Sequence, residues 1–173
     1  MSVSNIEHAS PRATSDDFKE AMSRVSYSVS VVSTYFSGRP YGKTINTLTP
    51  VSAEDPSVLI SLFRKSEITH NIIESGTFCV SVLGEAQKCI AENFARSSDH
   101  GNPFDRFEWG TLATGAPYVY GAVACFDCTL VETLHHASHT IIIGRINAIL
   151  DNSRQPLLHH RRAYRPCAET IIQ

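Results

Sequence analysis

Short hydroxyl and amide side chains follow one another along residues 41–52, YGKTINTLTPVS. On an extended backbone, alternate residues face opposite sides, and backbone N–H and C=O groups can meet the edge of a planar polar ring. Thr44, Asn46 and Thr47 are therefore candidate ring contacts. An ordinary polar edge strand is the alternative, because threonine favours strands.

A cationic, hydroxyl-bearing segment, SLFRKS, follows soon afterwards and ends at Ser66. Ser66 stands where a helix N-cap is expected, and the isoleucines of 67–75 have helical spacing up to a stop signal at Gly76. A helix N-terminus with Arg64 and Lys65 beside it attracts anions. The sequence thus predicts a phosphate site before this helix, with a solvated loop as the alternative.

The elements around these segments are mostly strands. We expect helices over 15–25, 67–75 and 85–95, strands over 27–36, 41–49, 57–63, 77–83, 121–134 and 138–150, and an irregular loop over 96–106. Short strands with small helices at the corners indicate a mainly β fold, a small closed or nearly closed barrel. Residues 1–13 are expected to be a flexible tail before one domain over 14–173.

Length and composition agree with one compact domain. A chain of 173 residues with 42% hydrophobic content can fill a single core. The formal charge of −2 gives no reason to expect a nucleic-acid partner. The N-terminus has no apolar signal region, and no run approaches the roughly 18 apolar residues that a membrane span needs. We therefore expect a cytoplasmic protein without a membrane partner.

Cysteines and histidines give two possible metal patterns. The five cysteines are scattered, and Cys125 and Cys128 lie on a predicted strand, where positions three apart face opposite sides. His136 and His139 have HxxH spacing but lie at a turn between two strands, without an obvious third ligand. We expect no metal site, and zinc stays the lesser alternative.

Common nucleotide and nucleophile motifs are absent from the sequence. It contains no GxGxxG, GxxxxGK[ST] or GxSxG pattern. A chain with so few catalytic side chains fits an enzyme whose cofactor supplies the chemistry.

A series of short segments adds a resemblance. In chain order they are TINTLTPVS, Pro56, VLISL, KSEIT, FCVSVL, Asn93-Phe94-Ala95, Asp105-Arg106-Phe107, Gly115-Ala116-Pro117, His139-Thr140 and Ile143-Gly144. Together they resemble the short-chain flavin reductases, FMN-binding split-barrel proteins that supply reduced flavin to two-component monooxygenases. The resemblance covers residues 17–165.

The resemblance implies an FMN-binding split β-barrel, a homodimer, and hydride transfer from NADH or NADPH to FMN or FAD. A partner monooxygenase would use the reduced flavin. The flavin-binding residues that it implies are Thr44, Asn46, Thr47, Ser61, Leu62, Lys65, Ser66, Arg106 and Phe107. It also implies that His139 contacts the nicotinamide, although His139 could instead be a surface hairpin residue.

The loop that contains Arg106 is open to two interpretations. Phe104, Phe107 and Trp109 could form a lid that stacks on a flavin or nicotinamide ring, or they could plug one end of the barrel. Arg106 could pair with Asp105 or with a cofactor phosphate.

Several residues depart from the family pattern. They are Lys43 for an apolar residue, Ser81 for asparagine, Ala137-Ser138 for Gly-Asp, Arg145 for an acidic residue, and His159 for tyrosine. The changes next to His139 leave open a flavoprotein that catalyses another oxidation or tailoring step, or a non-catalytic flavin-binding protein.

Overall fold

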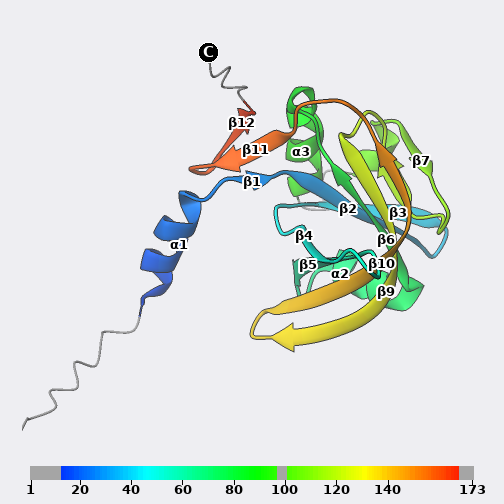
Figure 1. Cartoon of the computed structure of the whole chain (residues 1–173), viewed down its shortest axis with the longest axis horizontal. Coiled ribbons are helices and arrows are strands. Elements are labelled where there is room, and N and C mark those ends of the chain that lie inside the picture. The colour runs from blue at the N-terminus through cyan, green and yellow to red at the C-terminus, as the bar shows by residue number, and fades with distance from the viewer. Residues whose placement is uncertain (1–12, 97–100, 168–173) are drawn as a thin grey trace, which may run out of the picture.

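The computed structural model describes residues 13–96 and 101–167. Its body is a seven-stranded antiparallel sheet in the order β3-β2-β6-β9-β10-β5-β4 (Figure 1). These strands are β2 (Ser30–Phe36), β3 (Arg39–Ile45), β4 (Thr49–Ser52), β5 (Ser57–Phe63), β6 (Thr77–Val82), β9 (Ala124–His136) and β10 (His139–Asp151). The sheet stays open, with β3 and β4 at its two edges.

Two smaller sheets and a few helices complete the described part of the chain. One sheet has β1 (Tyr27–Ser28), β11 (Leu157–His160) and β12 (Ala163–Pro166), and the other has β7 (Trp109–Thr111) and β8 (Pro117–Val119). The helices are α1 (Ser15–Ser23), α2 (Glu67–Ser75) and α3 (Lys88–Ala95), with 3₁₀ turns at Glu85–Gln87 and Pro103–Asp105. None of the helices in the described residues is long and apolar enough to cross a membrane.

Two clusters of side chains fill most of the core. The strands alternate, so that Ile60, Phe78 and Ile142 from three strands pack together with Ile72 of α2. The second cluster lies under α3 and includes Phe94 and Phe104 among others. Gly144 is required in β10 because a Cβ there would overlap the ring of Phe78.

The predicted strand over 41–49 is wrong at its end. Strand β3 stops at Ile45, and the chain bends at Asn46 before β4 begins at Thr49. The reason is that a side chain takes the place of backbone hydrogen bonds between strands. The Thr47 hydroxyl accepts from the Ser61 N–H at 3.1 Å and donates to the Ser61 carbonyl at 3.0 Å.

Other predicted boundaries shift for similar reasons. The strand over 27–36 divides at Val29, because β1 pairs with β11 while β2 pairs with β3 and β6. The helix over 85–95 begins with the 3₁₀ turn and becomes α-helical at Lys88. Of the predicted irregular loop, residues 97–100 lie outside the described residues, as does most of the predicted tail over 1–13.

The two cysteines of the CxxC pattern lie on opposite faces of β9, as strand alternation predicted. Cys128 packs in the first core cluster, whereas Cys125 packs with Tyr118 and Ala122 in a third. Burial raises the pKa of Cys125 to about 11 and that of Cys128 to about 12. Both thiols therefore stay protonated near neutral pH.

Helix α1 and the C-terminal hairpin form an arm that stands beside the body (Figure 1). Thr14 and Asp17 form a capping box at the start of α1, and Ser23 at its end accepts a hydrogen bond from the Arg161 N–H at 2.7 Å. No residue of this helix is buried.

Candidate functional site

Helix α2 begins without a side-chain cap and next to two cationic residues. The Ser66 hydroxyl donates to the Phe63 carbonyl at 2.8 Å and lies 2.8 Å from the Thr69 hydroxyl. It therefore makes no capping hydrogen bond to a backbone N–H in the first turn of α2. The exposed side chains of Arg64 and Lys65 flank this turn. An uncapped helix N-terminus of this kind can accept an anion, as the sequence predicted for this place.

The loop before α2 is joined directly to the β9–β10 hairpin. The Arg64 N–H donates to the Ser138 carbonyl at 2.9 Å. Phe63 pairs with His139 in the register of β5 and β10, and their rings meet edge to face with centroids 6.1 Å apart. The predicted phosphate residues and the predicted nicotinamide residue are therefore neighbours.

His139 itself lies exposed at the first position of β10. Its Nδ1 is 3.0 Å from the Ser138 hydroxyl, which orients the ring. His136 is its direct partner across the hairpin, while His135 faces away and contacts the Thr140 hydroxyl. Within the described residues, no group of three or more His, Cys, Asp or Glu side chains could hold a metal ion.

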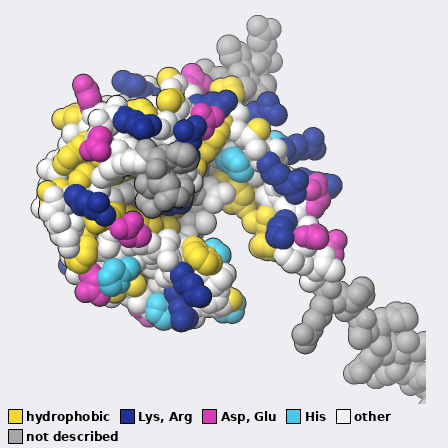
Figure 2. Space-filling model, turned by 180° about the vertical axis from the view of Figure 1, so that it is seen from behind, with side chains coloured by type: hydrophobic (Ala, Val, Ile, Leu, Met, Phe, Trp, Pro, Cys, Tyr) yellow, Lys and Arg dark blue, Asp and Glu magenta, His cyan; other side chains and the backbone are white. Residues whose placement is uncertain are grey.

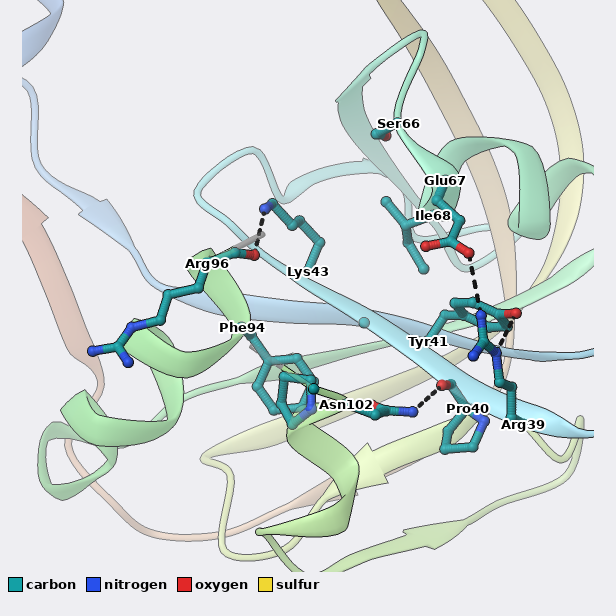
Figure 3. A pocket seen from close by; sticks show the side chains of 13 residues that line it. Arg39, Pro40, Tyr41, Lys43, Ser66, Glu67, Ile68, Phe94, Arg96 and Asn102 are labelled. Carbon is teal, nitrogen blue, oxygen red and sulfur yellow. Dashed lines mark hydrogen bonds and ion pairs between the residues drawn. The ribbon is translucent and has the colours of Figure 1, made fainter. Parts of the chain in front are cut away.

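A pocket of about 300 Å³ lies beside the start of α2 (Figure 3). Its walls come from four segments: Arg39–Lys43 of β3, Ser66–Ile68, the end of α3 with Phe94 and Arg96, and residues 101–103. Figure 3 shows the Glu67 carboxylate facing Arg39, an ion pair of 3.4 Å. The Arg39 guanidinium also lies 4.6 Å over the Tyr41 ring.

Lys43, one of the departures from the family pattern, has a defined role in this pocket wall. Its Nζ donates to the Ala95 carbonyl at 3.0 Å and to the Arg96 carbonyl at 3.1 Å, and Figure 3 shows the bond to Arg96. These carbonyls end α3, where a cation is favoured by the helix dipole. The charge in β3 thus fixes the end of a neighbouring helix.

The predicted ring residues divide between two places. Thr47 is bonded to the backbone of Ser61, next to the loop before α2. Thr44 and Asn46 line a smaller pocket of about 140 Å³, and the Thr44 hydroxyl donates to the Ala91 carbonyl at 2.7 Å. The side chain of Leu62 is buried in the core, so that only its backbone could contact a ligand.

Arg106 and Phe107 line a different pocket from the one that Ser66 lines. Arg106 donates to the Asn93 side chain at 3.3 Å, and Phe107 packs against the second core cluster. The ring of Phe104 is buried and meets Phe94 edge to face at 4.9 Å. This packing favours the plug interpretation for Phe104.

His159 and Tyr164 line the smaller pocket with Thr44 and Asn46. Sequence reasoning noted His159 only as a departure from the family pattern and did not consider Tyr164. The available signal was the segment PLLHHRRAYR, which resembles the family ending. Its strands were not recognised, because the hairpin turns at Arg161 and Arg162, residues that rarely adopt the positive φ found here.

A model of the flavin reductase like domain matches residues 22–168. The chain belongs to this family. The FMN reductase (NADH) RutF 2 of Methylorubrum extorquens is 31% identical over 149 residues, which cover 86% of this chain and 87% of that protein.

Two solved structures show the same fold. The NADH:FAD oxidoreductase SgcE6 of Streptomyces globisporus, in complex with NAD and FAD fragments, has a TM-score of 0.84 and 28% identity, covering 90% of this chain and 94% of that chain. The flavin reductase of styrene monooxygenase from Pseudomonas putida S12 has a TM-score of 0.81 and 29% identity, covering 88% and 97%. The predicted mainly β flavin reductase fold is confirmed, with the main sheet open rather than closed.

Proposed function

We propose that this protein is a flavin reductase that transfers hydride from NADH or NADPH to FMN or FAD. One observation carries the proposal: the uncapped start of α2, with Arg64 and Lys65, is hydrogen-bonded to the hairpin that carries His139. The residues proposed for a flavin phosphate thus lie beside the imidazole proposed for a dinucleotide. The relatives named for NADH and for flavin support this assignment.

The residues present fit a flavin at this surface. The first turn of α2 with Lys65 and Ser66 would hold the ribityl phosphate, since helix N-termini and charged donors bind phosphate. Thr47 and Ser61 would lie along the ring, and Leu62 would offer its backbone. When bound, the flavin supplies the ring nitrogen that accepts the hydride.

His139 would orient the hydride donor. An exposed imidazole fixed by the Ser138 hydroxyl can donate a hydrogen bond to the nicotinamide carboxamide. This activity suits the cytoplasm, which supplies NADH and NADPH. Because the similar flavin reductase of Pseudomonas putida serves styrene monooxygenase, we include a partner monooxygenase as the user of the reduced flavin.

A homodimer is part of the same proposal. Phe18 and Met22, four residues apart on α1, form an apolar face with 63% and 38% exposure, and Val25 just beyond the helix is 44% exposed. A nine-residue helix is shorter than the roughly 12–15 residues at which isolated helices become even marginal in water. A second copy of the chain would cover this face and stabilise the helix.

Oligomeric state in solution tests the dimer. Light scattering after size exclusion should give a dimer for the wild type and a monomer for the double variant Phe18→Glu and Met22→Glu. Lys19→Glu is the matched control, because it makes the same change in net charge from a polar position of α1. A wild-type monomer would contradict the dimer.

Steady-state turnover tests the reductase. Purified protein should oxidise NADH or NADPH only when FMN or FAD is added, or when it is purified with bound flavin. A yellow protein that neither dinucleotide reduces would instead support a non-catalytic flavin-binding protein or another oxidation, and a colourless protein without turnover would contradict flavin binding itself.

A further inference from the structure

The smaller pocket lies where the arm meets the body. Figure 2 shows the arm from behind, standing beside the rounded body with a hollow at the junction. The pocket of about 140 Å³ is lined by Val29, Thr44, Ile45, Asn46, His159 and Tyr164. It therefore joins two of the predicted ring residues to two residues of the C-terminal hairpin.

The hairpin presents its two rings as a fixed pair. His159 and Tyr164 are direct partners in the register of β11 and β12, and their rings meet edge to face with centroids 5.7 Å apart. Tyr164 also packs against the second core cluster. Burial raises the pKa of its phenol, and the nearby Glu92 adds to the shift. The hydroxyl therefore stays protonated at neutral pH and can donate a hydrogen bond.

Polar groups of this pocket have unused hydrogen-bonding capacity. Within residues 13–96 and 101–167, the Tyr164 hydroxyl, the His159 ring nitrogens and the Asn46 carboxamide have no hydrogen-bond partner in the protein. Val29 and Ile45 beneath them are 1% and 9% exposed and form an apolar wall. A small number of polar groups that converge on an apolar surface is typical of a ligand site.

We infer that His159, Tyr164 and Asn46 bind the pyrimidine edge of the flavin ring. This inference rests on the proposed function. The pyrimidine edge carries two carbonyls on either side of an N–H, which match two donors and an amide that can also accept. The dimethylbenzene edge of the flavin has no polar atoms and would leave these groups unpaired, at a cost in affinity.

The position of the pocket agrees with the phosphate site at the other end. Asn46 precedes Thr47, whose hydroxyl is bonded to Ser61, and β5 runs from Ser61 to Phe63 at the loop before α2. The pocket and the start of α2 are thus the two ends of one continuous stretch of the protein. In FMN, likewise, the central ring and the ribityl chain separate the polar ring edge from the phosphate.

Flavins without a phosphate isolate this end of the site. We would titrate the wild type, Tyr164→Phe and His159→Phe with riboflavin and with N3-methylriboflavin, by quenching of flavin fluorescence. Each variant keeps a ring of similar size, and Tyr35→Phe is a matched control, because the exposed Tyr35 hydroxyl bonds only to the nearby Gly38 carbonyl at 2.9 Å.

Each substitution in the pocket should weaken riboflavin binding roughly five-fold, as expected for one hydrogen bond, and N3-methylation should do the same for the wild type. The two effects should not add, because they disturb the same contacts. Additive effects, or pocket variants that bind like Tyr35→Phe, would overturn the inference while FMN reduction continued. A wild type that binds no flavin would overturn the proposed function as well.

Discussion

The anion site at α2 gives the sharpest consequence of the proposed function. Replacing Arg64 and Lys65 together by glutamine removes both charges and keeps polar side chains of similar reach. The hydrogen bond between the Arg64 N–H and the Ser138 carbonyl uses only the backbone and is retained. The variant should therefore fold normally, bind FMN more weakly, and bind riboflavin as the wild type does.

The expected magnitude follows from the exposure of both side chains. Charge-assisted hydrogen bonds contribute about 1.5–3 kcal/mol when shielded, but exposed ion pairs contribute about 0.2–1 kcal/mol. At about 1 kcal/mol for each residue, the double variant should lose roughly 30-fold in FMN affinity at low ionic strength. Salt should reduce this difference, because the Debye length falls to about 8 Å at physiological ionic strength.

Flavin fluorescence quenching with FMN and riboflavin at two salt concentrations measures both affinities. The helix N-terminus still contributes in the variant, so residual preference for FMN is expected. The reasoning would be refuted if the ratio of FMN to riboflavin affinity were the same in the variant and the wild type, since the phosphate would then bind elsewhere.

Three further results are expected. His139→Ala should lower kcat/KM for NADH by roughly 5- to 150-fold with flavin affinity unchanged, whereas the control His136→Ala should not; equal rates in stopped flow would make His139 a hairpin residue only. Because burial raises the pKa of Cys128 from 9.0 to about 12, the unfolded chain loses this proton first, and stability should fall as pH rises above 9; urea unfolding of Cys128→Ala should show a shallower decline, and an identical slope would refute the assignment. Lys43→Met should cost about 1–2 kcal/mol in the free energy of unfolding, because two hydrogen bonds to the end of α3 are lost; a urea midpoint equal to that of the wild type would show that the cap contributes nothing.

Local signals predicted some elements at their observed boundaries. Strand β5 (Ser57–Phe63) and helix α2 (Glu67–Ser75) begin and end at the residues that the sequence predicted. Alternation in the strand, Ser66 before the helix and Gly76 after it are each readable from a few neighbouring residues. The left-handed conformation of Gly76, with φ of 70°, confirms why the helix stops there.

Features that depend on distant residues could not be predicted in this way. The strand before Thr47 ends because the Thr47 hydroxyl is hydrogen-bonded to the backbone of Ser61. The cation of Lys43 is accommodated because the end of α3 lies beside it. The pair of His159 and Tyr164 depends on a hairpin whose turn lacks glycine and asparagine, the usual signals for positive φ. Such contacts exist only once the fold brings the segments together.

Reduction of bound FMN by NADH is the most direct test of the central claim. Protein loaded with FMN would be titrated with NADH, and then NADPH, without oxygen while the visible absorbance is followed. We expect the absorbance of oxidised flavin to disappear with one equivalent of dinucleotide per bound flavin. Absorbance that persists with both dinucleotides, although FMN is bound, would contradict the claim that this protein is a flavin reductase.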